Sequence, residues 1–320
     1  AYATADQPDV AKTPDQGFRP VDVKLGPDGA LYIADWTNPV INHGEVDFRD
    51  PRRDKKNGRI WRISHKGGKA VEWQPVWDAS TPRLLEALLS NNHWEQEQAK
   101  RVLGQRLGKG GVGELNAWRE RKNSAEAELA AAFVRSTIGG AEAALKDFQV
   151  KDAGTAAWEA RWRGALGAVA DNVERLSALA RHASPRVRVE AMRALCRIPT
   201  AASADAVAMA AEQVPAGDPQ YAFAAKLSMR EVGGLWVDAM LKGAWDWKGR
   251  ETQVLGRLQA LEQPEAARVV AAVMKEVALP PDLSGPWAEL VALGGDAQEA
   301  GKVWALVAQP AQKPAVIGKG

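Results

Sequence analysis

Residues 184–198 read SPRVRVEAMRALCRI, a stretch in which apolar residues recur three and four positions apart. An α-helix has about 3.6 residues per turn, so residues at this spacing share one face. The apolar positions on that face are Val187, Ala191, Ala194, Leu195 and Ile198. Ser184 precedes Pro185, a residue order that favours a helix start. The stretch therefore predicts a helix that begins near Pro185 and buries one side.

The same kind of helix start recurs along the chain. It is found at Thr81–Pro82, Asp218–Pro219 and, in a weaker form, Gln263–Pro264. Pro185, Pro219 and Pro264 are separated by 34 and 45 residues, which is the length of a repeat built from two helices. Helix pairs that stack on their neighbours form an α-solenoid. We therefore expect a mainly α fold, with a helical-repeat domain over residues 75–320.

One part of this helical region has a weaker pattern. The repeats are least regular over residues 108–157, and residues 108–113 are rich in glycine. The Gly-rich stretch lacks the Gly-Lys-Ser/Thr ending of a phosphate-binding loop and follows no clear strand. It therefore predicts a flexible connection.

The segment before residue 75 has the period of strands. Val21, Val23 and Leu25 alternate with polar residues, as in a half-buried strand. The turn residues Gly26–Gly29 follow. Further strands are expected at Leu31–Ala34, at Arg59–Ile63 and, as a fourth candidate, at Ala70–Trp73. Residues 1–74 thus predict one small antiparallel sheet with a long loop at residues 35–58, and a sheet of this size needs neighbours to be stable.

Composition excludes several functions for this chain. Its 42 basic and 40 acidic residues nearly cancel, so we expect neither nucleic acid nor an anionic membrane as partner. Cys196 is the one cysteine and no CxxCH motif is present, so we expect no bound cofactor, no haem and no metal site. No apolar run reaches the roughly 20 residues that span a bilayer. The chain begins at Ala1 rather than Met, and we expect it to be a piece of a longer polypeptide.

The loop that follows the second strand is the candidate binding site. It combines carboxylates, amides, a histidine and arginines, which can hold a metal or, through the arginines, a carboxylate or phosphate. Loops at strand ends often carry function. The candidate ligand-binding residues are Asp35, Asn38, His43, Glu45, Asp47, Arg49, Asp50, Arg52, Arg53 and Asp54. No set of acid, base and nucleophile stands out, so the sequence predicts no catalytic residue.

A structural role for this loop is the alternative interpretation, and the charge balance favours it. Residues 45–59 contain six basic and four acidic side chains. A long loop must satisfy its backbone polar groups, and Arg–Asp pairs do so well. A mesh of internal salt bridges fits this balance better than an anion site does.

The chain resembles the large membrane-bound dehydrogenase or haem-binding proteins of planctomycetes and verrucomicrobia. The resemblance lies in RPVDVKLGPDGALYIADW at residues 19–36, HGE at 43–45, DFRDPRRD at 47–54 and GRIWRI at 58–63. In that family a β-propeller similar to that of glucose/sorbosone dehydrogenases precedes HEAT repeats and a cytochrome c domain. The resemblance implies that residues 1–74 are the last propeller blade and that residues 75–320 are HEAT-like repeats.

The resemblance also implies a function. We expect a scaffold segment of an extracytoplasmic, periplasmic redox protein, which links the propeller to a cytochrome domain outside this chain. Haem c is then expected only in that further part, and the dehydrogenase activity belongs to the parent protein rather than to this chain alone. One alternative is that loop 35–54 contributes to a sugar-oxidising or metal-binding propeller site. A second is a solenoid that binds a protein on its concave face.

Overall fold

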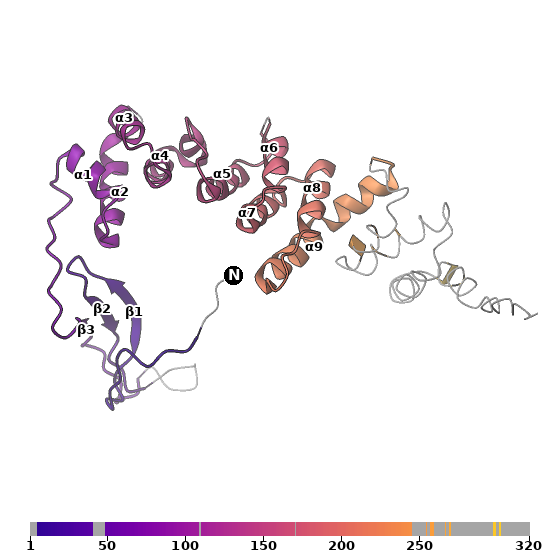
Figure 1. Cartoon of the computed structure of the whole chain (residues 1–320). Helices are drawn as coiled ribbons and strands as arrows, with labels where there is room; N and C mark the ends of the chain where they lie inside the picture. Colours follow the sequence, from indigo (N-terminus) through magenta and orange to yellow (C-terminus); the bar gives the residue numbers. More distant parts are fainter. Residues whose placement is uncertain are drawn as a thin grey trace, which may run out of the picture. The chain divides into compact units, whose positions relative to one another are not determined.

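The chain is described by a computed structural model (Figure 1). The described residues are 5–40, 49–108, 110–169 and 171–244, with eight isolated positions beyond them. They are mainly helical, with one small antiparallel sheet, as the sequence predicts. Residue contacts group the chain into two compact units, Tyr2–Gln149 and Val150–Gly320.

The sheet has three strands in the order β1-β2-β3. These strands are β1 (Pro20–Leu25), β2 (Leu31–Asp35) and β3 (Arg59–Ile63). All neighbours are antiparallel, and the register aligns Val23, Ile33 and Trp61 across the sheet. The Gly26 amide donates to the Ala30 carbonyl at 2.8 Å, which closes the β1–β2 hairpin. The predicted hairpin and third strand are confirmed.

The fourth candidate strand, Ala70–Trp73, is not formed, and this prediction is wrong. Side-chain packing holds this stretch instead of a hydrogen-bonded ladder. The Trp73 ring packs edge-on against Trp94 with centroids 5.4 Å apart, and it lies 6.4 Å from Trp77. The Val71 amide makes a single backbone bond, to Asp28 at 3.1 Å. An alternating apolar pattern therefore marks a contact between aromatic rings at the surface here rather than a strand.

Four helices follow the sheet among the described residues of the first unit. They are α1 (Thr81–Ala87), α2 (His93–Leu107), α3 (Val112–Lys122) and α4 (Ala125–Leu145). Their apolar faces meet in one core that includes Leu84, Leu103, Leu115 and Trp118. The Gly-rich connection lies between α2 and α3 as expected, but residues 108–157 are more regular than their sequence pattern indicates. α4 is rich in alanine, so its buried face lacks the large side chains that mark a stripe; its backbone angles depart from helical values at Gly139 and Gly140.

A buried ion cluster joins α3 to α4. Arg119, Glu128 and Arg135 expose 5% of their surface or less. Glu128 Oε1 accepts a hydrogen bond from Arg119 at 3.3 Å and lies 3.7 Å from Arg135 Nη2. The guanidinium groups also donate to the carbonyls of Asp147 and Ala144. Removal of one partner would leave a buried charge without compensation, so we expect the loss of any one of the three side chains to destabilise the fold.

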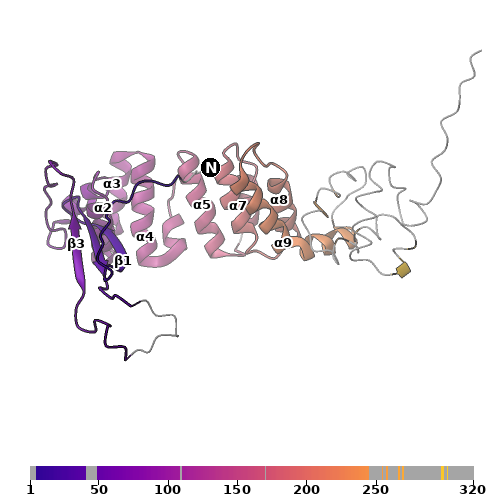
Figure 2. The ribbon, with the colours of Figure 1, turned by 90° about the horizontal axis from the view of Figure 1, so that it is seen from below.

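The second unit contains five helices among its described residues. They are α5 (Ala153–Leu166), α6 (Asn172–Leu179), α7 (Pro185–Leu195), α8 (Ala201–Ala211) and α9 (Pro219–Leu241). Each helix contacts the next along the chain, and alternate helices also touch: α5 with α7, α7 with α9 and α6 with α8. Figures 1 and 2 show α5 and α7 side by side. Their apolar stripes form one continuous core.

The predicted helix starts lie within one residue of the observed ones. α7 begins at Pro185 and α9 at Pro219, whereas α1 begins at Thr81, with Ser80 as its N-cap. Of these three starts, the Asp218 carboxylate alone accepts a capping hydrogen bond, from the Tyr221 amide at 3.0 Å. The Gln263–Pro264 start lies outside the described residues.

Arg188 connects three segments of the second unit. It is 8% exposed and forms no ion pair with a carboxylate among the described residues. It donates to the carbonyls of His182, Ala183 and Gln213 at 2.9 to 3.0 Å and to the Tyr221 hydroxyl at 3.2 Å. These carbonyls follow α6 and α8, where the helix dipole favours a cation.

Replacing Arg188 tests this role. Arg188→Met leaves the three carbonyls without their donor, so we expect a loss of about 2–3 kcal/mol in the free energy of unfolding. Urea unfolding followed by circular dichroism measures the loss. The matched control is Arg186→Met, because Arg186 is exposed on the same helix and surface changes usually stay within about 0.5 kcal/mol. Equal destabilisation by both variants would contradict the assignment.

Candidate functional site

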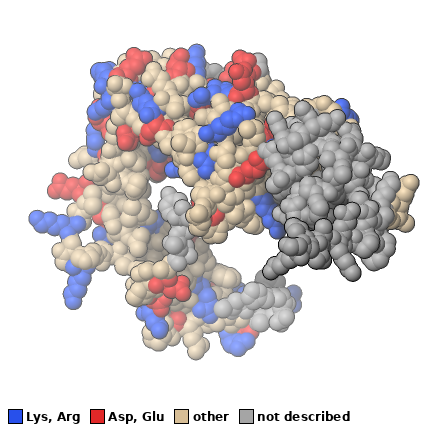
Figure 3. All heavy atoms as spheres, turned by 45° about the vertical axis from the view of Figure 1, so that its right-hand side comes forward, with Lys and Arg blue, Asp and Glu red and all other residues tan. Residues whose placement is uncertain are grey.

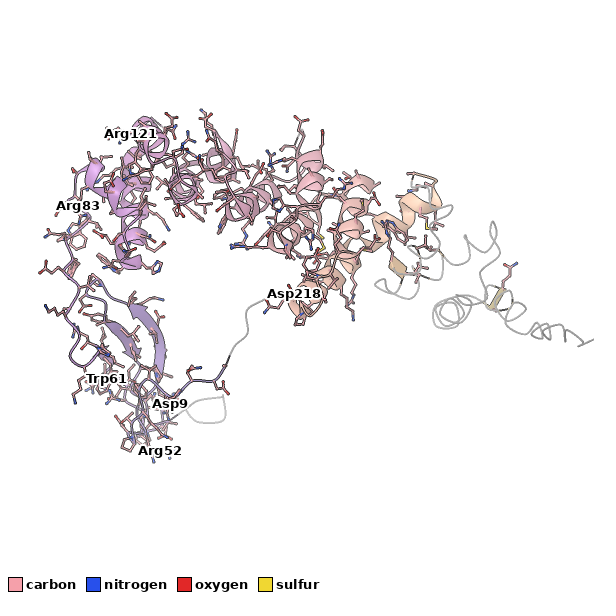
Figure 4. The ribbon with its side chains drawn as sticks, viewed as in Figure 1. Asp9, Arg52, Trp61, Arg83, Arg121 and Asp218 are labelled. Carbon is pink, nitrogen blue, oxygen red and sulfur yellow. The ribbon has the colours of Figure 1, made fainter. Side chains whose placement is uncertain are left out.

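Seven of the ten predicted site residues lie in the described part of the chain. Asp35 and Asn38 follow β2, and the other five precede β3 in the order Arg49, Asp50, Arg52, Arg53 and Asp54. His43, Glu45 and Asp47 lie outside the described residues. Figure 4 shows Trp61 on the sheet and Arg52 in the adjoining loop.

The Asp35 carboxylate is buried at the end of β2 and accepts four hydrogen bonds. Its Oδ1 accepts from the amides of Arg19 and Thr37 at 2.8 and 2.9 Å. Its Oδ2 accepts from Arg59 Nε at 2.9 Å and from Trp61 Nε1 at 2.8 Å. Antiparallel pairing places Arg59 opposite Asp35. The carboxylate thus joins the ends of β2 and β3 to the residue that precedes β1, and its lone pairs are occupied by protein donors.

These contacts set the charge of Asp35. Burial by itself raises the pKa of a carboxyl group. The hydrogen bonds from Trp61, Arg19 and Thr37, and the Arg59 charge, outweigh burial and lower the pKa of Asp35 to about 2. The group is therefore ionised near neutral pH. A carboxylate held this firmly stabilises the sheet and is poorly suited to take up a proton.

The loop before β3 is organised by its own carboxylates. Asp50 binds Arg52 through both oxygens at 2.6 to 3.2 Å, and this pairing lowers the pKa of Asp50 to about 2. Asp54 accepts from the amides of Lys56 and Asn57 at 3.0 Å, as in an Asx-turn. These contacts are the kind that the structural interpretation requires. A ligand-binding role for the loop stays a prediction.

A hollow opens beside this loop. Its volume is about 740 Å³, which falls within the usual range for small-molecule pockets. The residues that line it are Asp15, Gln16, Gly17, Thr37, Pro39, Asp50, Pro51, Arg52, Arg53, Asp54, Lys55, Lys56 and Asn57. The structure therefore brings four predicted site residues to one hollow, together with a segment that precedes β1.

Sequence reasoning missed three side chains next to this hollow. Arg59 donates from Nη1 to Asp15 at 2.7 Å and from Nε to the Thr37 hydroxyl at 2.9 Å. Asp15 is 44 residues from Arg59 in the chain, so no local spacing relates them. The predicted hairpin and third strand could have placed Arg59 opposite Asp35, because antiparallel register pairs the end of one strand with the start of the next.

The described residues contain no group of three His, Cys, Asp or Glu side chains able to hold a metal ion. The Cys196 thiol is half-buried, and burial raises its pKa to about 11. The reactive thiolate is therefore scarce at neutral pH. None of the described helices is both long and apolar enough to cross a bilayer.

Comparisons with known proteins give one similarity. Residues 2–67 match a family described as a domain of unknown function, DUF7133. This match spans all three strands and the loop between β2 and β3. Neither a curated protein nor a solved structure matches the chain.

The Asp35 contacts can be tested by substitution. Asp35→Asn places an amide NH₂ where Oδ2 accepts from Arg59 and Trp61, so donors would face donors. We expect a loss of about 1–3 kcal/mol in sheet stability and a shift of the Trp61 indole N–H resonance in NMR spectra. Asp22→Asn is the control, because Asp22 is exposed and Lys24 is its one ion-pair partner among the described residues. An unshifted Trp61 resonance would contradict the contact.

The pH dependence follows from the same residue. The folded-state pKa of Asp35, about 2, lies below the value near 3.9 of an unfolded chain. Its stabilising contribution is thus complete above about pH 4 and is lost as the pH falls toward about 2. We expect acid unfolding of Asp35→Asn to lack this part of the wild-type pH dependence. A constant difference in stability between the two proteins from pH 6 to about pH 2 would contradict it.

Proposed function

We propose that this chain is a scaffold segment of a multidomain redox protein outside the cytoplasm. In this proposal α-helices stacked as HEAT-like repeats form a solenoid, and the sheet is the last blade of a β-propeller. The solenoid links that propeller, similar to that of glucose/sorbosone dehydrogenases, to a cytochrome c domain. The chemistry and the haem belong to those other domains of the parent protein, which is extracytoplasmic, in the periplasm.

The pattern of contacts between helices in the second unit is the observation that supports this proposal most. α5, α7 and α9 begin at Ala153, Pro185 and Pro219, in steps of 32 and 34 residues. Contact between alternate helices is what two parallel layers of helix pairs produce. Matching ion pairs join successive members of one layer: Arg161 to Glu190 at 2.8 Å and Arg193 to Glu231 at 2.9 Å. Such a stack keeps its ends at a fixed separation, which is the property a scaffold needs.

The surface of the sheet supports the propeller part of the proposal. All six residues of β1 are exposed, and Val21 and Val23 expose 65% and 51% of their surface. A three-stranded sheet with an apolar, exposed edge strand is marginal in water. A further blade packed against it would cover these side chains. The proposed domain boundary near residue 75 follows the change from strands to helices.

The proposal can be tested by replacing the proposed scaffold in the parent protein. Residues 75–320 are exchanged for a Gly/Ser linker of equal length, and the rate of electron transfer from propeller to cytochrome is measured. A flexible linker gives only an effective concentration instead of a fixed position, so we expect the rate to fall about tenfold. The control parent carries Arg186→Ala. An unchanged rate with the linker, or a parent without propeller and cytochrome domains, would overturn the proposal.

Protein binding by the helical unit is a second candidate function. Phe223 and Leu227 lie one turn apart on α9 and expose 70% and 39% of their surface. Exposed aromatic residues are frequent anchors in protein interfaces. If this surface binds a domain of the parent, Phe223→Ala should weaken that binding by tenfold or more, whereas Val214→Ala, outside α9, should not. Equal binding by both variants would exclude the surface.

A further inference from the structure

We propose that the hollow lined by residues 15–17 and 50–57 binds a small molecule through an oxyanion group, a carboxylate or a phosphate. This inference is independent of the scaffold role. It rests on the charge that remains once the ion pairs inside the loop are accounted for.

The carboxylates at the hollow already have partners. Asp50 is bound by Arg52 through both of its oxygens. Asp15 pairs with Arg59 at 2.7 Å, and Asp54 accepts from two backbone amides and from the Asn57 side chain at 2.9 Å. A metal ion would have to displace these donors. The chemistry of the lining therefore disfavours a cation.

The cations at the hollow are less fully neutralised. Arg52 shares its charge with Asp50, but the ammonium groups of Lys55 and Lys56 form no ion pair with any described residue. Both lysines are exposed and neighbour each other in the chain. Uncompensated charges of one sign along a hollow attract ligands of the opposite sign. The lining thus favours an anion.

Arg59 lies behind Gly17 and is not itself among the residues that line the hollow. Its Nη2 is buried and finds no hydrogen-bond acceptor among the described residues. A Cβ added at Gly17, which lines the hollow, would lie 3.9 Å from this nitrogen. The other two guanidinium nitrogens are committed to Asp15, Asp35 and the Thr37 hydroxyl. Because this nitrogen is buried, Arg59 acts on an anion in the hollow through its positive charge, which adds to that of the lysines.

Thr37, which lines the hollow, is held in one conformation. Thr37 has a left-handed backbone, with φ of 53°, which is unusual for a β-branched residue. Its amide donates to Asp35 and its hydroxyl accepts from Arg59. This part of the lining therefore keeps its position before a ligand arrives, which reduces the entropy lost on binding. The volume of about 740 Å³ exceeds that of a phosphate ion, so the rest of the ligand has room beyond its anionic group.

NMR titration of the full chain with inorganic phosphate and, separately, with malonate tests this inference. We expect saturable shifts of the Lys56 and Asn57 amide resonances with a Kd in the millimolar range. Phosphate alone would indicate a phosphorylated ligand, malonate alone a carboxylate, and either supports the site. We expect Lys55→Ala combined with Lys56→Ala to weaken binding, because two positive charges are removed. The expected loss is only about tenfold, because solvent screens the charge of each exposed lysine.

The matched control combines Lys66→Ala with Lys69→Ala. These lysines are also exposed, lie near β3 and do not line the hollow, so this variant removes the same charge. Binding unchanged in the control and weakened in the Lys55/Lys56 variant supports the proposal. Equal weakening in both variants, or no saturable shift with either anion, overturns it. Circular dichroism of both variants checks that folding is intact.

Discussion

Each helix of the second unit buries its apolar stripe against the helix two places along the chain as well as against its sequence neighbour. Val187, Ala191 and Leu195 of α7 are buried in this way, in a core shared with α5, α8 and α9. A helix of 11 residues, such as α7, is marginal alone in water. Its stability therefore depends on both neighbours, and the interface between repeats is the constraint on which the unit depends.

Buried charges complete this packing where apolar contacts cannot. Arg188 binds carbonyls that follow two helices, and Arg119 and Arg135 bind carbonyls at the end of α4. Asp35 plays the same part in the sheet, with opposite charge, by accepting from two backbone amides. In each case a charged side chain satisfies backbone groups that the secondary structure leaves unpaired. The main role of these buried charged side chains is therefore to stabilise the fold.

This structural use of charged side chains determines which of them are left to bind a ligand. Asp35, Asp50 and Asp15 are paired with arginines or backbone amides, whereas Lys55 and Lys56 form no ion pair within the part of the chain that the structure describes. On the face shown in Figure 3, acidic and basic side chains are intermixed, in keeping with a nearly neutral chain. The hollow beside β3 thus favours an anion because some of its charged side chains form no ion pair among the described residues, and not because of how many charged side chains it has. Exposed apolar residues lie on β1 and on α9, where the proposed protein contacts would be made.

The sequence by itself determined the mainly helical class, the hairpin, the third strand and the helix starts at Pro185 and Pro219. These features depend on local periodicity, turn residues and capping, which act over a few positions. It also located the loop at the candidate site. Tertiary structure alone decided that residues 70–73 pack through Trp73 rather than pair as a strand, and that Asp35 is held by Arg59 and Trp61. Those outcomes depend on contacts between residues 21 or more positions apart, and side-chain burial and partner choice at that range are settled by packing.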